Sequence, residues 1–215
     1  MKPVSIVPAE PTRRILDANS RLLPITAIIQ TYNNAEGLEH TLKSLDGEVD
    51  RVLVLDGRFE MKTVHQQRPR TGRASTDNSR QVAEKYKAEW IPADRDYKWQ
   101  WDKMNRVPEL VKPGDWTFWI DTDEELVTYV HNGLRQIAGW FSPHADMLMI
   151  KIDEPYFSHP LTGYLGRHRY YARLIKILPG MKWIDEANIV YPGRVSTYSG
   201  TVPNIIFIRH LRKDL

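Results

Sequence analysis

Residues 114–126 read Gly-Asp-Trp-Thr-Phe-Trp-Ile-Asp-Thr-Asp-Glu-Glu-Leu, and this stretch indicates both a fold and a site. The opening Gly-Asp is a turn signal. Residues 116–120 form a short apolar run rich in aromatic and β-branched side chains, which predicts a strand buried on both faces. Where that strand ends, four carboxylates follow within five residues: Asp121, Asp123, Glu124 and Glu125. Ligands bind at the carboxyl ends of strands in open α/β sheets, so this strand end is a candidate site.

Carboxylates packed this closely raise one another's pKa unless a cation lies among them. A divalent metal is one such cation, because hard oxygen ligands suit Mg²⁺ or Mn²⁺. The alternative is that Asp121 and Asp123 cap a following helix whose first turn holds Glu124 and Glu125, where acidic side chains interact favourably with the helix dipole. Both interpretations stay open on the pattern alone, since Asp-x-Asp also occurs at residues 94–96.

The composition is that of an ordinary globular domain. The chain has 215 residues, 41% hydrophobic and 27% charged, with a net charge of +3. Cysteine is absent, which excludes disulfides and thiolate metal sites. No apolar run approaches the roughly 18 residues of a membrane helix, and we expect a soluble, cytoplasmic protein. The basic segment 58–74 suits a phosphate-bearing partner, or it is a solvated loop.

The first half of the chain alternates predicted strands and helices. The strands are expected at residues 25–29, 51–55, 89–91 and 116–120, and the helices at 36–45, after 75–77, at 102–111 with a break at Pro108, and at 126–140. This alternation predicts an α/β fold with a mostly parallel central sheet flanked by helices. Further strands at 147–152, 170–178 and 205–209 predict a smaller mixed part.

Taken in order, four motifs resemble those of the GT-A glycosyltransferases, specifically the family 2-like enzymes that use nucleotide-diphosphate sugars. The likeness covers residues 25–210. The motifs are residues 25–33 ending in Tyr-Asn, residues 52–56 followed by Ser75-Thr76-Asp77, Asn105-Arg106 followed by residues 114–124, and Arg173-Leu174-Ile175-Lys176 followed by residues 179–183. The chain departs from the family at Gly57, where a second Asp is common, in the inserted segment 58–74, and at Asp185, where many relatives have His.

The resemblance implies a GT-A type (Rossmann-like) fold and a metal-dependent inverting transfer of a sugar. Four prolines and the lack of a clear period predict an N-terminal arm over residues 1–24, followed by a single domain over 25–215 with a nucleotide-binding half (25–125) and an acceptor-side half (126–215). The metal, Mn²⁺ or Mg²⁺, would be held by Asp123 and by Asp121, which alternatively contacts the ribose. His210 lies where some relatives have a late histidine ligand, and an imidazole would favour Mn²⁺; the alternative is a surface histidine.

The same resemblance implies roles for the other site residues. Nucleotide binding would involve Thr31, Tyr32, Asn33, Asp56, Lys103, Arg106 and Asp121. Within that set, Asp56 would contact the base or ribose, and Lys103 and Arg106 would reach the phosphates unless they face solvent, as helix residues of this kind often do. The general base would be Glu186, with Asp185 as its alternative. The loop at residues 157–171 would be a lid or an ordinary surface loop.

The implied donor is a nucleotide-diphosphate sugar, with UDP as first choice, and the acceptor is a saccharide, a lipid-linked molecule or a protein. No nucleic-acid partner and no transmembrane segment are expected. One alternative function is a nucleotidyltransferase on a similar sheet, which the lack of a glycine-rich phosphate loop after the first strand disfavours. Another is a non-catalytic nucleic-acid-binding module that uses the basic segment and the tryptophans.

Overall fold

The computed structural model describes residues 22–58, 73–154, 167–184, 189–190, 199–201 and 206–210. Four strands form the parallel part of its main sheet, in the order β3-β2-β1-β4. They are β1 (Ile25–Thr31), β2 (Arg51–Asp56), β3 (Glu89–Ile91) and β4 (Trp116–Asp121). All seven positions of β1 are buried, as expected for an inner strand of a parallel sheet covered on both faces.

The sheet continues beyond β4 as a mixed sheet. The order is β4-β7-β6-β11-β5, and β10 also pairs with β6. The bounds are β5 (Glu124–Thr128), β6 (Met147–Glu154), β7 (Arg167–Lys176), β10 (Ser199–Thr201) and β11 (Ile206–His210). β7 is antiparallel to both β4 and β6, and β5 is antiparallel to β11. A separate short pair joins β8 (Lys182–Trp183) and β9 (Ile189–Val190). The predicted fold class, an α/β fold with a mostly parallel central sheet flanked by helices and a smaller mixed part, is confirmed.

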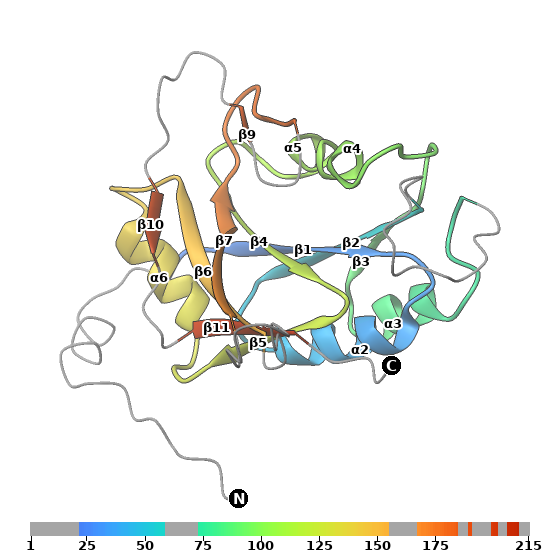
Figure 1. Ribbon diagram of the computed structural model, residues 1–215, viewed down its shortest axis with the longest axis horizontal. Coiled ribbons are helices and arrows are strands. Elements are labelled where there is room, and N and C mark those ends of the chain that lie inside the picture. The colour runs from blue at the N-terminus through green and yellow to red at the C-terminus, as the bar shows by residue number, and fades with distance from the viewer. Residues whose placement is uncertain are drawn as a thin grey trace, which may run out of the picture.

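Helices cover both faces of the sheet (Figure 1). On one face lie α2 (Ala35–Ser44), α3 (Ser79–Lys85) and α6 (Gly133–Phe141), and on the other lie α4 (Gln100–Met104) and α5 (Val107–Leu110). Side chains along β1 alternate between two buried clusters: Ile25, Ala27 and Ile29 belong to the first, and Ile28 belongs to the cluster beneath α4 and α5. Both cores therefore share the same inner strands.

The helix predicted at residues 126–140 is wrong in its first part. Residues 124–128 form β5, and α6 begins only at Gly133. The spacing of Leu126, Val130 and Leu134 suits a helix, but the backbone of Leu126 pairs with Ile208 of β11, a partner that the local pattern does not contain. Glu124 and Glu125 consequently lie in a strand, so the alternative that placed them in a helical first turn is also wrong.

Two predicted helices differ in detail from the structure: one begins later than predicted, and the other is interrupted. The helix expected after Ser75-Thr76-Asp77 begins at Ser79, because the Asp77 carboxylate accepts hydrogen bonds from the backbone N–H and hydroxyl of Ser79 at 3.0 and 2.6 Å. The helix predicted at 102–111 was expected to break or restart at Pro108; it is interrupted at residues 105–106, and Pro108 lies in the first turn of the restarted helix α5. Within the described part of the chain, no helix is long and apolar enough to cross a bilayer.

Several expectations fall on residues outside those described. They are most of the N-terminal arm, most of the basic segment 58–74, and residues 157–166 of the loop at 157–171.

Candidate functional site

The carboxyl ends of β2, β1 and β4 meet at one edge of the sheet. The parallel register places Thr31 beside Asp56 and Gln30 beside Asp121. Two acidic residues that are far apart in sequence, Asp56 and Asp121, therefore flank the end of the same inner strand. This is the edge at which open α/β sheets bind their ligands.

Asp56 is almost fully buried and is held by hydrogen bonds from Ser75. Its Oδ1 accepts hydrogen bonds from the backbone N–H of Ser75 at 3.1 Å and from the Ser75 hydroxyl at 2.7 Å. Asn33 joins the same contact, because its backbone N–H donates to the Ser75 hydroxyl oxygen at 2.9 Å and its Oδ1 accepts from the N–H of Thr76 at 2.7 Å. Asp56 and Asn33 thus shape this edge of the site through Ser75 and Thr76.

Gly57, the residue after Asp56, occupies a position that suits only glycine. Its φ is +124°, a conformation that side chains rarely adopt. A Cβ atom there would lie 2.9 Å from the Tyr97 ring and 3.0 Å from the Cβ of Ala93. An aspartate at this position would be strained and crowded, so Asp56 at the end of β2 has no second carboxylate directly after it.

Lys103 of α4 lies beneath the same strand ends. Its ammonium group donates to the backbone carbonyl oxygens of Thr31 and Leu55, both at 3.2 Å, and the side chain has no exposed surface. Burial lowers the pKa of Lys103 to about 7, and the negative charges of Asp56 and Asp121 oppose that shift. The alternative in which Lys103 faces solvent is therefore wrong.

Arg106 is also turned inward, so its solvent-facing alternative is wrong as well. Its guanidinium donates to the carbonyl oxygen of Pro92 at 3.1 Å and to the Tyr97 hydroxyl oxygen at 2.9 Å, and 15% of the side chain is exposed. These contacts hold the segment between β3 and α4. Of the other predicted nucleotide ligands, Tyr32 is half-buried and Thr31 is buried.

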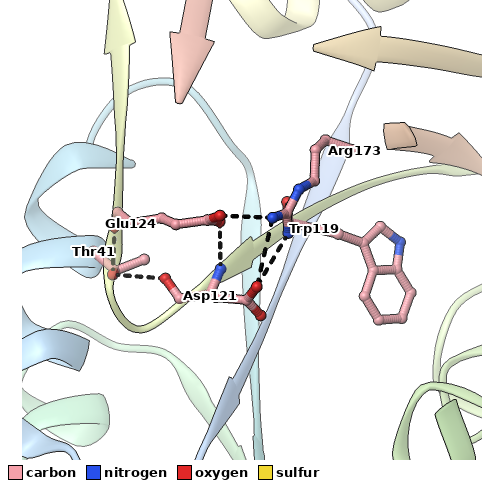
Figure 2. A network of polar contacts seen from close by, with 5 residues as sticks. All are labelled: Thr41, Trp119, Asp121, Glu124 and Arg173. Atoms are coloured by element: carbon pink, nitrogen blue, oxygen red, sulfur yellow. Dashed lines mark hydrogen bonds and ion pairs between the residues drawn. The ribbon is translucent and has the colours of Figure 1, made fainter. Parts of the chain in front are cut away.

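The acidic strand end is a tight corner. β4 ends at Asp121, Thr122 and Asp123 form a turn, and β5 begins at Glu124. The backbone N–H of Asp121 donates to Oε2 of Glu124 at 3.0 Å. The hydroxyl of Thr41, on α2, lies 2.7 Å from the carbonyl oxygen of Glu124 and 3.2 Å from that of Asp121 (Figure 2). Helix α2 therefore fixes both ends of the turn.

Arg173 of β7 supplies a cation among these carboxylates (Figure 2). Its guanidinium donates to Oε1 of Glu124 at 2.6 Å and to Oδ2 of Asp121 at 3.5 Å. Burial raises the pKa of Glu124 to about 7, and the positive charge of Arg173 offsets part of that rise. From the sequence, a divalent metal was the expected cation among these carboxylates. A signal was present in the sequence, because the predicted strand 170–178 is apolar or aromatic apart from two cations, Arg173 and Lys176.

Asp121 and Asp123 are the candidate ligands for a divalent metal. Within the described ranges, no three His, Cys, Asp or Glu side chains are grouped to hold an ion. However, Mg²⁺ sites commonly use one or two carboxylates together with substrate phosphates. The Asp121 side chain is 36% exposed and lines a cleft, and Asp123 is half-buried in the adjacent turn. This donor set fits a metal that binds together with a diphosphate.

Three predicted residues come from the last part of the chain. The register of β11 with β5 places His210 directly opposite Glu124, so the backbone brings this residue to the acidic corner. Asp185 and Glu186, the predicted bases, lie outside the described residues. Trp183, two residues before Asp185, lines the cleft.

The cleft has a volume of about 510 Å³ and opens beside the acidic corner. Its floor comes from β1, β4, β6 and β7, and α4 and the β8–β9 pair contribute to its walls. Asp121, Glu124 and Arg173 lie at its polar end, together with Gln30, which the sequence reasoning did not single out.

Comparisons with known proteins concern the fold. No family model and no curated protein matches the chain. Among solved structures it is similar to S. aureus TarS (TM-score 0.44, 19% identity, 61% of this chain and 22% of that one) and to TarS residues 1–349 (TM-score 0.44, 19% identity, 61% and 36%). It is also similar to glucosyl-3-phosphoglycerate synthase from Mycobacterium tuberculosis, in complex with Mn²⁺, UDP and glucosyl-3-phosphoglycerate (TM-score 0.40, 18% identity, 65% and 47%). The chain spans less than half the length of each of these structures, and its function has to be argued from its own residues.

Proposed function

We propose that this chain is a metal-dependent, inverting glycosyltransferase that moves a sugar from a nucleotide diphosphate, with UDP as first choice, to an acceptor hydroxyl. The observation that carries the proposal is the strand-end arrangement. Asp121 lies at the carboxyl end of β4 with its side chain partly exposed at a cleft, and Asp56 lies across the end of β1 from it. The order of motifs along the sequence supports the same assignment.

Asp121 and Asp123 would hold the Mn²⁺ or Mg²⁺ ion, with phosphate oxygens among its other ligands. A metal in this place stabilises the negative charge that grows on a departing diphosphate. Arg173 keeps the Asp121 carboxylate at the cleft edge through its 3.5 Å contact, while its shorter contact neutralises Glu124. His210 is the proposed further ligand because it lies opposite Glu124 in the β5–β11 register.

The other residues at the strand ends would bind the nucleotide. Asp56, Tyr32 and the Ser75 segment would form the wall against the base and ribose. Lys103 is fully enclosed, so it would act through its charge beneath the strand ends rather than by direct contact. We propose Glu186, or Asp185, as the base that takes the proton from the acceptor hydroxyl, a role worth about 10²–10⁴ in rate.

A thermal-shift series with UDP, GDP and UDP-glucose, each with and without Mn²⁺, tests the proposal. We expect UDP with Mn²⁺ to stabilise the protein more than either alone, since a ligand at 100 times its Kd adds roughly 2.7 kcal/mol. Asp121→Asn and Asp123→Ala should lose the Mn²⁺-dependent part, and Asp123→Ala should abolish sugar transfer. The matched control is Asp115→Ala, an exposed acid just before β4, which should behave as wild type. Full Mn²⁺-dependent binding of UDP by Asp123→Ala would remove the metal assignment.

A further inference from the structure

The floor of the cleft changes from apolar to polar side chains over two residues along β1 and β4. In the register of β1 with β4, Ile28 lies beside Trp119, and Gln30 lies beside Asp121 two residues later. Trp183 of β8 packs on Trp119, with ring centroids 4.8 Å apart. Because alternate residues of a strand share a face, these side chains project to the same side of the sheet.

Apart from Gln100 of α4, the lining side chains outside the polar end are apolar or aromatic. Met147 and Met149 come from β6, and Tyr171 and Ala172 from β7, where Tyr171 is 37% exposed. Methionine side chains adapt to ligands of irregular shape. A volume of about 510 Å³ is in the range of small-molecule sites, which span roughly 300–1,000 Å³.

Gln30 is the unusual polar group on this floor. The residue is 9% exposed, and its Oε1 atom is enclosed without a hydrogen-bond partner in the part of the chain that the structure describes. Leaving such an oxygen unpaired is destabilising, because it has lost its hydrogen bonds to water without gaining others. Gln30 lines the cleft, so a rotation of its amide would bring this oxygen to the cleft surface, where the hydroxyl group of a ligand beside Asp121 would donate to it.

The lining also indicates what kind of molecule binds. A diphosphate does not suit the apolar end, where no cation lines the walls, and a fully polar saccharide would leave its hydroxyl groups without partners there. A molecule with a hydroxyl at one end and an aromatic or aliphatic group at the other satisfies both ends of the cleft.

We propose that the cleft is the acceptor subsite and that it takes an amphipathic acceptor, with its hydroxyl at Gln30 and its apolar group along Met147, Met149 and Tyr171. This proposal rests on the proposed function. In the transfer, the bond between the sugar's anomeric carbon and the diphosphate breaks, and the acceptor oxygen forms the new bond to that carbon. The hydroxyl proton goes to the general base, and the nucleotide diphosphate leaves with the bonding electrons.

The test uses the full chain and two matched probes, 4-nitrophenyl β-D-glucopyranoside and methyl β-D-glucopyranoside, in isothermal titrations with UDP and Mn²⁺ present. We expect the aryl glycoside to bind at least about tenfold more tightly, because only it carries an apolar group for the cleft. Ala172→Trp should fill the cleft and abolish aryl glycoside binding while leaving Mn²⁺-dependent UDP binding unchanged. Ala172→Ser is the control and should retain both.

Gln30→Leu is a second variant, and we expect it to fold. It should unfold at the same or a higher temperature, because it removes an unpaired buried oxygen, and it should bind the aryl glycoside about fivefold more weakly. Equal binding of the two glycosides, or unchanged aryl glycoside binding by Ala172→Trp, would overturn the acceptor proposal. A wild-type protein that binds the aryl glycoside but shows no Mn²⁺-dependent binding of UDP would instead overturn the proposed function.

Discussion

Lys103 is a basic residue with no exposed surface, placed where three strands end. The sequence offered two roles for it, phosphate contact and solvent exposure, because charged residues of short helices usually face outward. The structure places it instead under the carbonyl oxygens of Thr31 and Leu55. Its partners come from two different strands, so no local pattern around residue 103 could have indicated them.

This burial makes stability depend on pH. The pKa of Lys103 is lowered from 10.5 to about 7 in the folded chain. Between about pH 7 and 10.5 the unfolded chain holds a proton on Lys103 that the folded chain has released. The free energy of unfolding therefore rises with pH above about 7. Below pH 7 Lys103 is charged in both states, and the full cost of burying its charge is present. We expect the free energy of unfolding of wild type to gain about 2 kcal/mol over that of Lys103→Met between about pH 7 and 9.

Urea unfolding of both proteins across this pH range measures the difference. Lys112→Met, at an exposed position before β4, is the matched control and should follow the wild-type profile. Parallel profiles for wild type and Lys103→Met would show that Lys103 keeps an ordinary pKa.

Helix α2 is the element that shapes the acidic corner. The Asn34 side-chain amide donates to the hydroxyl oxygen of Thr122 at 2.8 Å and to its carbonyl oxygen at 3.3 Å. Thr41, two turns further along, holds the carbonyl oxygens of Asp121 and Glu124. The proposed metal ligands are thus positioned by a helix that lies about 80 residues earlier in the chain, and α2 touches the turn closely at Gly37.

Gly37→Ala tests this close approach. A Cβ atom at residue 37 would overlap the carbonyl oxygen of Thr122 and the Asn34 amide, so α2 would have to move away from the turn. We expect a loss of about 1–3 kcal/mol in stability and weaker Mn²⁺-dependent binding of UDP. Helix propensity alone predicts the opposite sign, a gain of roughly 1 kcal/mol. Chemical unfolding and the thermal-shift series with UDP and Mn²⁺ provide the two measurements.

Glu36→Ala, at an exposed position on the same helix turn, is the control and should change stability by no more than about 0.5 kcal/mol. A Gly37→Ala protein more stable than wild type would show that α2 and the turn do not touch as described.

The sheet joins the two halves of the chain, for which we propose nucleotide-binding and acceptor-side roles. β4 pairs with β7, which comes from the second half, and both contribute to the same buried cluster through Phe118 and Leu174. We therefore propose that residues 25–215 unfold as one unit, and that opening the acceptor side also loosens the acidic corner.

Leu174→Ala tests the single unit. Leu174 is fully buried, so its truncation should cost about 2–5 kcal/mol. Tryptophan fluorescence and far-UV circular dichroism should report one coincident unfolding transition, shifted equally in both signals. Val190→Ala, at an exposed position, should leave the transition near its wild-type midpoint. Two separate transitions, only one of them shifted, would show that the halves fold independently.

Local apolar runs in the sequence were enough to predict the inner strands β1, β2 and β4, the strands β6, β7 and β11 of the second half, and the placement of Asp56 and Asp121 at strand ends. These predictions hold because a strand buried on both faces must be apolar at nearly every position, whatever its neighbours are. β5, the inward turn of Lys103, the contact of Arg173 with Glu124 and the cleft around Gln30 were not foreseen. Each depends on side chains or strands about 50 or more residues apart, and such contacts exist only once the sheet has brought them together.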